Sequence, residues 1–486
     1  MSDWEYIKDR FEQDCVTAPD SLSEEKIRSL LEEQNAGEPA ELPERQVVSP
    51  VVTPARGAGS QKTKKKHWIR NSIAVAACLL LVVVSVPKLI GPPDTSMTDD
   101  GYRTYESYGE LKRLIDSLAE SPGFFGWNKK EELVEYETAD LAMEDSAPLS
   151  AGAGSSSAND ASDTYVQVEG VDEADKIKTD GKYIYHVTGE GDIYILAADR
   201  GKTRKVAEIS KFDENGYFSQ IYLAEDRLVA VGTLYEDEEL KAAVTTYDIS
   251  DPENPVELQQ FLQSGYTVSS RLTGGILYLV TNDYVGGGDR YVPYVTQNGT
   301  YQKMPVGDIC VFPNPESASY IVVSSVNVTS GKEMETVSKA ILGSSSEIYC
   351  NTEHLYVAGR NYEDTGNGYQ VTTRLLRVDL NDGKIKFSVN GKVRGSVYGQ
   401  FGMDERDGYF RIATTSVRNG RDVNNLYILD DSLNQVGSVT GFARNEHIEA
   451  VRYVGDKAYV ITYERTDPLF ILDLSDPEDP VIEGEV

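Results

Sequence analysis

The feature that most constrains the fold of this chain is a residue pattern that recurs six times after residue 175. A Gly- or Asp-containing turn precedes a segment of alternating Tyr, Val and Leu, as in TDGKYIYHVT, TGGILYLVTN and VGDKAYVITY. A second apolar segment follows and often ends in an acidic turn, as in PLFILDLSDPEDP. The turns start at Asp180, Glu225, Gly274, Thr352, Arg406 and Gly455, with a period of about 45 residues apart from one longer gap.

This period predicts a mainly β fold, a β-propeller of four-stranded blades at residues 164–486. About 45 residues accommodate about four short strands, and such a sheet cannot bury both of its faces alone. The repeats must therefore stack, with aromatic and β-branched side chains between them. The 30 tyrosines and 41 glycines of the chain agree with a fold rich in strands and turns.

The longer gap, between Gly274 and Thr352, contains NDYVGGGDRYVPYVTQNGTYQKMPVGDICVFPNP. Its glycines and prolines predict a loop insertion. Because long loops on a rigid scaffold usually carry recognition, residues 282–313 are the best candidate contact surface.

An acidic segment, VQVEGVDEADKIKTDGKYIYHV, leads into the first repeat. A calcium loop of the EF-hand type starting at Asp172 fails, because Ala174, Lys176 and Lys178 stand where oxygen ligands are required. We therefore interpret the segment as the entry to the first strand pair, with TDGK as its turn.

A non-standard cation site formed by Asp172, Glu173 and Asp175 is the alternative interpretation of this segment. The sequence therefore leaves the metal ligands unknown.

Motifs for catalysis or cofactor binding are absent from the sequence. GxSxG does not occur, and the Gly-Lys-Thr at residue 201 has Leu196 where a P-loop requires glycine. His186 and His354 lie at equivalent hairpins of two repeats, and we interpret both as ordinary strand or turn residues. We predict no catalytic residues, no cofactor-binding residues, no cofactor and no enzymatic activity.

The cysteines do not form a CxxC motif, so zinc and thioredoxin-type chemistry lack support. Cys310 and Cys350 either form a disulfide, if this region lies outside the cell, or are two separate buried thiols. We favour the separate thiols.

An apolar stretch divides the chain. Trp68–Ile90 has about the length that a bilayer-spanning helix needs, and four lysines between Lys62 and Lys66 precede it. The positive-inside rule predicts a single-pass transmembrane helix with the N-terminus in the cytoplasm and the propeller outside, at the cell membrane.

The parts that flank this stretch are short. We expect residues 1–67 to be a cytoplasmic tail with a helix over 21–34, where Ser21 and Glu24 form a capping box. Residues 91–163 are expected to hold a second amphipathic helix, with Leu111, Leu114, Ile115 and Leu118 on one face, and a low-complexity linker at 144–163.

The formal net charge of −32 argues against nucleic acid as a partner, because binding through phosphates requires basic surface. Nearly all of this charge lies after residue 70. The extracytoplasmic part should therefore be repelled by anionic lipid and cell-wall polymers unless cations bridge them.

Three motifs carry a resemblance to a known family: VQVEGVDEADKIKTDGKYIY, GSSSEIYCNTEHLYVA and VRYVGDKAYVITYERTDPLFILDLSDPEDP. The chain resembles, over roughly residues 103 to 486, the bacterial membrane-anchored or secreted β-propeller proteins that are distantly related to WD-type repeats. The resemblance implies an extracytoplasmic propeller and supplies no catalytic residues.

Family members continue past the DPEDP blade, whereas this chain ends at Val486. We expect an incomplete ring whose last blade, at 446–484, leaves Tyr459, Ile461 and Phe470 partly exposed. The alternative is a closed six-bladed ring to which TYVQVEGV contributes a strand.

Three functions fit these patterns. The first is a binding or scaffold module at the cell surface, with the membrane as anchor and a protein or cell-envelope ligand on the propeller. The second is transmembrane signalling through the helix at 21–34. The third is a metal-dependent propeller hydrolase.

The predicted topology can be checked with a reporter that is active only outside the cytoplasm. Fused after Ser150, it should be active, because the lysines at 62–66 hold the preceding end of the span inside. Activity restricted to fusions before Gln61 would reverse the orientation.

Overall fold

The structure, a computed structural model, describes residues 95–97, 102–120 and 166–486, apart from short gaps at 199–200, 213–214, 237–238, 286–289, 313–314, 316, 331–334, 365–368, 419 and 464–467. The predicted helix at 21–34, the predicted span at 68–90 and the linker at 144–163 lie outside these residues. Within the described ranges, no helix is both long and apolar enough to cross a membrane.

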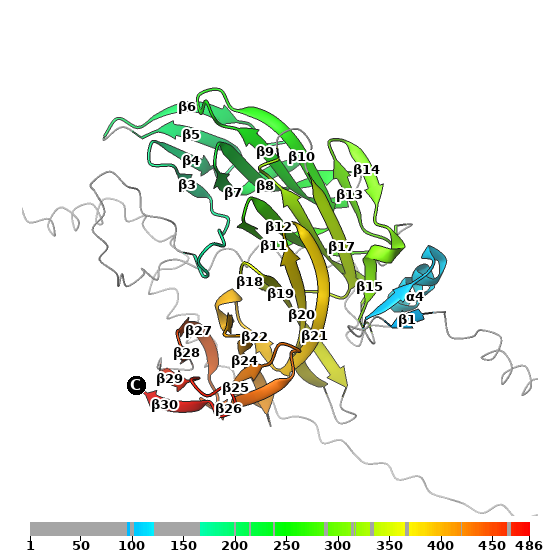
Figure 1. Ribbon diagram of the computed structural model, residues 1–486, viewed down its shortest axis with the longest axis vertical. Helices are drawn as coiled ribbons and strands as arrows, with labels where there is room; N and C mark the ends of the chain where they lie inside the picture. The colour runs from blue at the N-terminus through cyan, green and yellow to red at the C-terminus, as the bar shows by residue number, and fades with distance from the viewer. Residues whose placement is uncertain are drawn as a thin grey trace, which may run out of the picture. The chain divides into compact units, whose positions relative to one another are not determined.

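The described strands form six sheets, and their strands follow chain order closely (Figure 1). The first sheet contains β3 (Ile177–Thr179), β4 (Tyr183–Val187), β5 (Ile193–Ala197) and β6 (Arg204–Ile209). The fourth contains β18 (Glu347–Cys350), β19 (His354–Asp364), β20 (Tyr369–Asn381) and β21 (Lys384–Arg394), and the sixth contains β27 (His447–Val454), β28 (Lys457–Tyr463), β29 (Leu469–Asp473) and β30 (Val481–Glu485). These three sheets have the four antiparallel strands that the repeat predicted.

The other three sheets are larger. The second contains β7 (Gly216–Ala224), β8 (Arg227–Glu236), β9 (Glu239–Asp248), β10 (Val256–Ser264), β13 (Tyr294–Gln297) and β14 (Thr300–Lys303). The third contains β11 (Tyr266–Thr273), β12 (Ile276–Tyr284), β16 (Ser319–Asn327), β17 (Thr336–Leu342), β15 (Ile309–Val311), β2 (Arg103–Tyr105) and β1 (Thr95–Met97). The fifth contains β22 (Ser396–Val397), β23 (Met403–Arg406), β24 (Tyr409–Arg418), β25 (Arg421–Leu429) and β26 (Gln435–Phe442).

All six predicted turns lie at the hairpin between the first full strand of a sheet and the next. Glu225 and Asp407 adopt the left-handed conformation there, with φ of 53° each, and Gly274 and Gly455 adopt it in the equivalent turns. The acidic turns after the later strands are also confirmed, because Asp248 Oδ1 accepts the Ser250 N–H and Asp473 Oδ1 accepts the Ser475 N–H. These bonds lower the pKa of both carboxyls.

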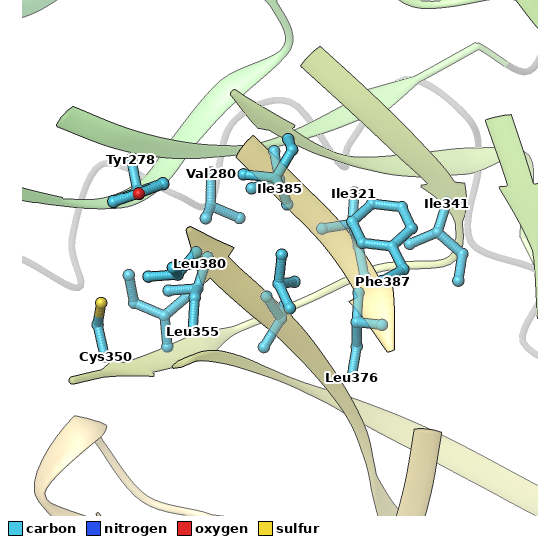
Figure 2. Packing of buried hydrophobic residues seen from close by; sticks show 14 of the residues in the cluster. Tyr278, Val280, Ile321, Ile341, Cys350, Leu355, Leu376, Leu380, Ile385 and Phe387 are labelled. Atoms are coloured by element: carbon cyan, nitrogen blue, oxygen red, sulfur yellow. The ribbon is translucent and has the colours of Figure 1, made fainter. Parts of the chain in front are cut away.

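Apolar clusters join each sheet to the next. The cluster between the third and fourth sheets includes Tyr278, Val280, Ile321 and Ile341 from one side and Leu355, Leu376, Leu380, Ile385 and Phe387 from the other (Figure 2). Equivalent clusters join the first sheet to the second, the second to the third, the fourth to the fifth and the fifth to the sixth. The predicted stacking of the repeats is therefore present.

The last sheet differs from the first in its partners. In the described part of the chain, no core cluster contains residues of both the first and the sixth sheet. Ile461 is 39% exposed and Tyr459 is half-buried, so the expected partial exposure of these two side chains is confirmed. Phe470 differs, because its side chain packs on Phe442 of the fifth sheet and is buried.

We name the segment at 166–176 the crossing segment. It contacts edge strands of several sheets before the chain enters the first sheet. Gln167 donates to the carbonyls of Gln400 and Met403 at the fifth sheet. Asp172 pairs through its backbone with Leu272 of β11, and Asp175 pairs with Ile221 of β7. The described residues 166–171 form no strand, so they do not supply the closing strand of the alternative model.

Candidate functional site

The insertion at 282–313 forms structure instead of the predicted plain loop. Its hairpin β13–β14 pairs with β10 and extends the second sheet. After a short 3-10 helix, η2 (Val306–Asp308), strand β15 pairs in parallel with β17 and extends the third sheet. The insertion therefore joins two neighbouring sheets through main-chain hydrogen bonds, which hold it rigidly.

The predicted amphipathic helix is present as α4 (Tyr108–Glu120), and it covers the insertion. Leu111 and Ile115 are buried in one cluster with apolar residues of the insertion, and Leu114 and Leu118 pack against it. The Tyr108 hydroxyl donates to the carbonyl of Met304 over 2.9 Å. Strand β2, just before the helix, pairs with β15. This part of the chain is therefore held both by main-chain hydrogen bonds of β2 and by side-chain packing of α4.

A cavity of about 500 Å³ opens beside the hairpin, and we name it the insertion pocket. Its lining combines tyrosines with basic residues: Glu239, Lys241, Arg290, Tyr291, Val292, Tyr294, Thr296, Tyr301 and Lys303. Its volume lies within the range of about 300 to 1,000 Å³ that is usual for small-molecule sites. The insertion, which the sequence marked as the candidate contact surface, therefore lines a cavity in the structure.

A network of charges links Arg290 and Glu239, which line the insertion pocket, to Asp283. Arg290 donates to Asp283 over 2.6 and 2.8 Å and to Glu239 over 2.6 Å. Burial raises the pKa of Glu239, but hydrogen bonds from Tyr294 and Arg290 outweigh burial and lower it overall. The Tyr294 hydroxyl donates to Glu239 over 2.7 Å, and burial first and this carboxylate second raise the pKa of that hydroxyl. At neutral pH, Glu239 is therefore ionised, Arg290 is protonated and the Tyr294 hydroxyl is neutral.

The rim of the insertion pocket carries cations stacked on tyrosine rings. Lys303 Nζ lies 3.9 Å from the ring centre of Tyr108 and 4.6 Å from that of Tyr291. The ring of Tyr301 lies 4.9 Å from that of Tyr294, and 59% of Tyr301 is exposed. These are cation–π and ring–ring contacts that leave the outer faces of the rim open to solvent.

Sequence reasoning located the insertion, which supplies seven of the nine residues that line the pocket, but missed the two from β9 and the Tyr108 ring that contacts Lys303. Glu239 and Lys241 belong to β9, which borders β10, and Tyr108 belongs to α4. No local pattern marks these residues. Only the pairing of β13 with β10 and the docking of α4 bring them to the insertion.

The acidic residues of the opening segment do not converge on one point. Asp172 pairs with Lys178 over 2.8 Å, and Asp175 Oδ1 accepts the N–H of Lys176. Glu173 accepts a hydrogen bond from Gln400 and faces Arg271 at 3.9 Å. Among the residues that the structure describes, no three His, Cys, Asp or Glu side chains form a group that could hold a metal.

The pair of Asp172 and Lys178 sets an expectation for stability. Lys178 is only 6% exposed, so Asp172→Asn leaves a buried cation without its carboxylate and should cost about 2 to 4 kcal/mol of unfolding free energy. The double variant Asp172→Asn with Lys178→Met should recover most of the loss, because no charge is then left unpaired. Thermal denaturation should give the same result in calcium and in chelator, and a calcium-dependent gain that Asp172→Asn abolishes would establish the cation site instead.

The two histidines of equivalent hairpins have separate surroundings. His186 lies in β4 of the first sheet, whereas His354 begins β19 of the fourth. His354 Nδ1 lies 3.0 Å from Glu405 of the fifth sheet, and Glu405 also accepts from Asn351 over 2.7 Å. The hydrogen bond to Glu405 raises the pKa of His354 against the effect of burial. Burial raises the pKa of Glu405, but His354, together with hydrogen bonds from Tyr356 and Asn351, outweighs burial and lowers the pKa overall.

The pair of His354 and Glu405 should stabilise the junction of the fourth and fifth sheets in a defined pH window. The contribution of Glu405 is full above its ordinary pKa of 4.5 and is lost as the pH falls through its lowered value. The contribution of His354 is full below its ordinary pKa of 6.5 and is lost as the pH rises through its raised value. Glu405→Gln should therefore lower the unfolding free energy most between pH 4.5 and 6.5, by about 1 to 3 kcal/mol.

Chemical denaturation from pH 4 to pH 9 measures this difference, and the exposed pair of His447 and Glu449 provides the control. His447→Gln should change stability little at any pH. A loss in Glu405→Gln that does not vary with pH would contradict the ionised pair.

Cys310 and Cys350 are two separate thiols and not a disulfide, in line with the favoured interpretation. Cys350 is buried in the core, and burial raises the pKa of its thiol to about 12. Cys310 lies in β15 and is half-buried against the same cluster.

Comparisons with known proteins agree with this architecture. The chain is 29% identical over 406 residues to an uncharacterized protein of Methanocaldococcus jannaschii, covering 67% of this chain and 61% of that protein. It is 24% identical over 495 residues to an uncharacterized protein of Archaeoglobus fulgidus, covering 86% and 78%. The chain thus spans about three-fifths of the first relative. Both relatives are archaeal and uncharacterized. The bacterial origin and the membrane anchor of this chain stay predictions.

Solved structures share only a distant likeness. An acylaminoacyl peptidase of Pyrococcus horikoshii has a TM-score of 0.31 and 15% identity over 64% of this chain and 45% of its own. Hsv2 of Kluyvelomyces marxianus has a TM-score of 0.29 and 10% identity over 63% and 82%. Scores this low support no argument about function. The model of the Beta propeller domain, in contrast, matches residues 161–486, and the chain belongs to that family.

Proposed function

We propose that this chain is a membrane-anchored, extracytoplasmic binding module that holds its ligand in the insertion pocket. A β-propeller domain supports a binding or scaffold role in general terms. The observation that carries the specific proposal is the pocket itself, built by an insertion that two sheets and a helix hold in place. Rigid walls favour binding because little conformational entropy is lost when a ligand is held.

The chemistry of the pocket favours binding over catalysis. Glu239 is held ionised by Arg290 and Tyr294, so its carboxylate is not poised to exchange protons near neutral pH. Elsewhere, His354 is bonded to Glu405, and the pKa of about 12 keeps the buried Cys350 thiol protonated. These side chains act in structure, which supports a protein without enzymatic activity.

The proposed location rests on the sequence. The apolar stretch Trp68–Ile90 and the lysines before it support a single span with the propeller outside the cytoplasm. In that place, the ligand is a protein or another component of the cell envelope.

Photocrosslinking in intact cells tests the binding role of the insertion pocket. A photoreactive phenylalanine placed at Tyr301 should capture a discrete species, because this side chain forms the exposed rim. The same replacement at Tyr362 of β19, which is 52% exposed and does not line the pocket, is the matched control. Mass spectrometry should find the species at position 301 and not at 362. Equal yields at both positions, or none at 301, would contradict the proposal.

A further inference from the structure

One cation of the insertion pocket has its charge available to a ligand. Arg290 donates hydrogen bonds to the carboxylates of Asp283 and Glu239, and Lys241 donates to that of Glu236 over 2.7 Å. Lys303 is exposed, and its contacts in the described structure are the tyrosine rings and the Tyr291 hydroxyl, with no carboxylate among them. An incoming anion therefore meets Lys303 without competing with a carboxylate for its charge.

Beside Lys303 lies a supported aromatic surface. Tyr294 is 3% exposed and fixed by its bond to Glu239, and Tyr301 rests on it with an interplanar angle of 33°. Such a ring offers a flat apolar face together with a hydroxyl at its edge. A pyranose ring has the matching features, because its axial C–H bonds form an apolar face and its hydroxyls form a polar edge.

We propose that the insertion pocket binds short acidic saccharides, with the carboxylate of a uronic acid unit at Lys303 and the face of the sugar ring on Tyr301. This inference rests on the proposed function, since it names the ligand class of the same pocket. A peptide made of Asp and Glu alone would offer the carboxylate but no ring to lie on Tyr301, so the exposed aromatic surface favours the saccharide.

The net charge of the chain limits the length of this ligand. At −32 the protein repels polyanions as a whole, but at physiological ionic strength the Debye length is about 8 Å, so the charges near the pocket decide local binding. Three of the nine lining residues are cations and one is a carboxylate. Units of a long polymer that extend beyond the pocket gain no lining cation and are repelled by the overall negative charge, so affinity should not rise with length beyond a few units.

Titration calorimetry with the full chain in detergent tests the inference. The probes are a tetramer of glucuronic acid, the same tetramer with its carboxyl groups reduced to alcohols, and a tetraglutamate peptide. The acidic tetramer should bind, the reduced tetramer should bind at least about fivefold more weakly because it lacks the charge at Lys303, and the peptide should bind more weakly still.

Two variants separate the contributions of charge and ring. Lys303→Met keeps the aliphatic length and should weaken the acidic tetramer about fivefold without changing the reduced one. Tyr301→Leu should weaken both tetramers by about three- to tenfold, whereas Tyr301→Phe should keep most of the affinity. Lys384→Met and Tyr362→Leu, at exposed positions outside the pocket, are the matched controls and should bind as the parent chain does.

Each contrary outcome has one meaning. Equal affinity for the two tetramers, or tighter binding of tetraglutamate, would overturn the acidic saccharide as the ligand class. Saccharide binding that neither pocket variant affects would place the site elsewhere and overturn the inference. If crosslinking succeeds at Tyr301 while no saccharide binds, the binding role stands and only this ligand class fails. If crosslinking fails as well, the proposed function fails with it.

Discussion

Burial of the apolar faces between successive sheets is the interaction on which the rest of this structure depends. Each sheet has two faces, and a sheet of four short strands cannot cover either of them by itself. Clusters such as the one around Leu355, Leu376 and Phe387 remove both facing surfaces from water at once. Because every inner sheet is packed on both sides, its hairpins have fixed positions, and side chains at the sheet junctions, such as His354 and Glu405, meet reproducibly.

The crossing segment adds a second constraint, because it connects sheets that are far apart in sequence. Its backbone pairs with β11 and β7, and Val171 is buried between the third and fourth sheets. The acidic side chains of this segment pair with cations around it. Asp172 neutralises the buried Lys178, and Glu173 lies near Arg271, so the density of carboxylates serves local pairing.

The insertion shows how such a scaffold gains a binding surface. Main-chain ladders bind the insertion to two sheets, and α4 covers its apolar side. The tyrosines are thereby held with their rings in contact with lysines and with one another, while Arg290 is neutralised by Glu239 and Asp283. What remains exposed is a ring face and one cation, and this combination supports the proposed recognition of an acidic saccharide.

The sequence by itself determined the repeat, the strand type, the six hairpin turns and the apolar face of α4. These features depend on residues close together in the chain: alternation sets which side of a strand is apolar, and Gly, Asp and Asn permit left-handed turns. The tertiary structure alone decided that the insertion adds strands to two sheets and that the crossing segment contacts sheets far apart in the sequence. It also decided that Glu239 and Lys241 share a pocket with Tyr301 and that Tyr108 lies against Lys303. It also decided that Phe470 is buried against Phe442. These outcomes depend on which strand edges and apolar faces meet across long separations in the chain, and local periodicity contains no information about such partners.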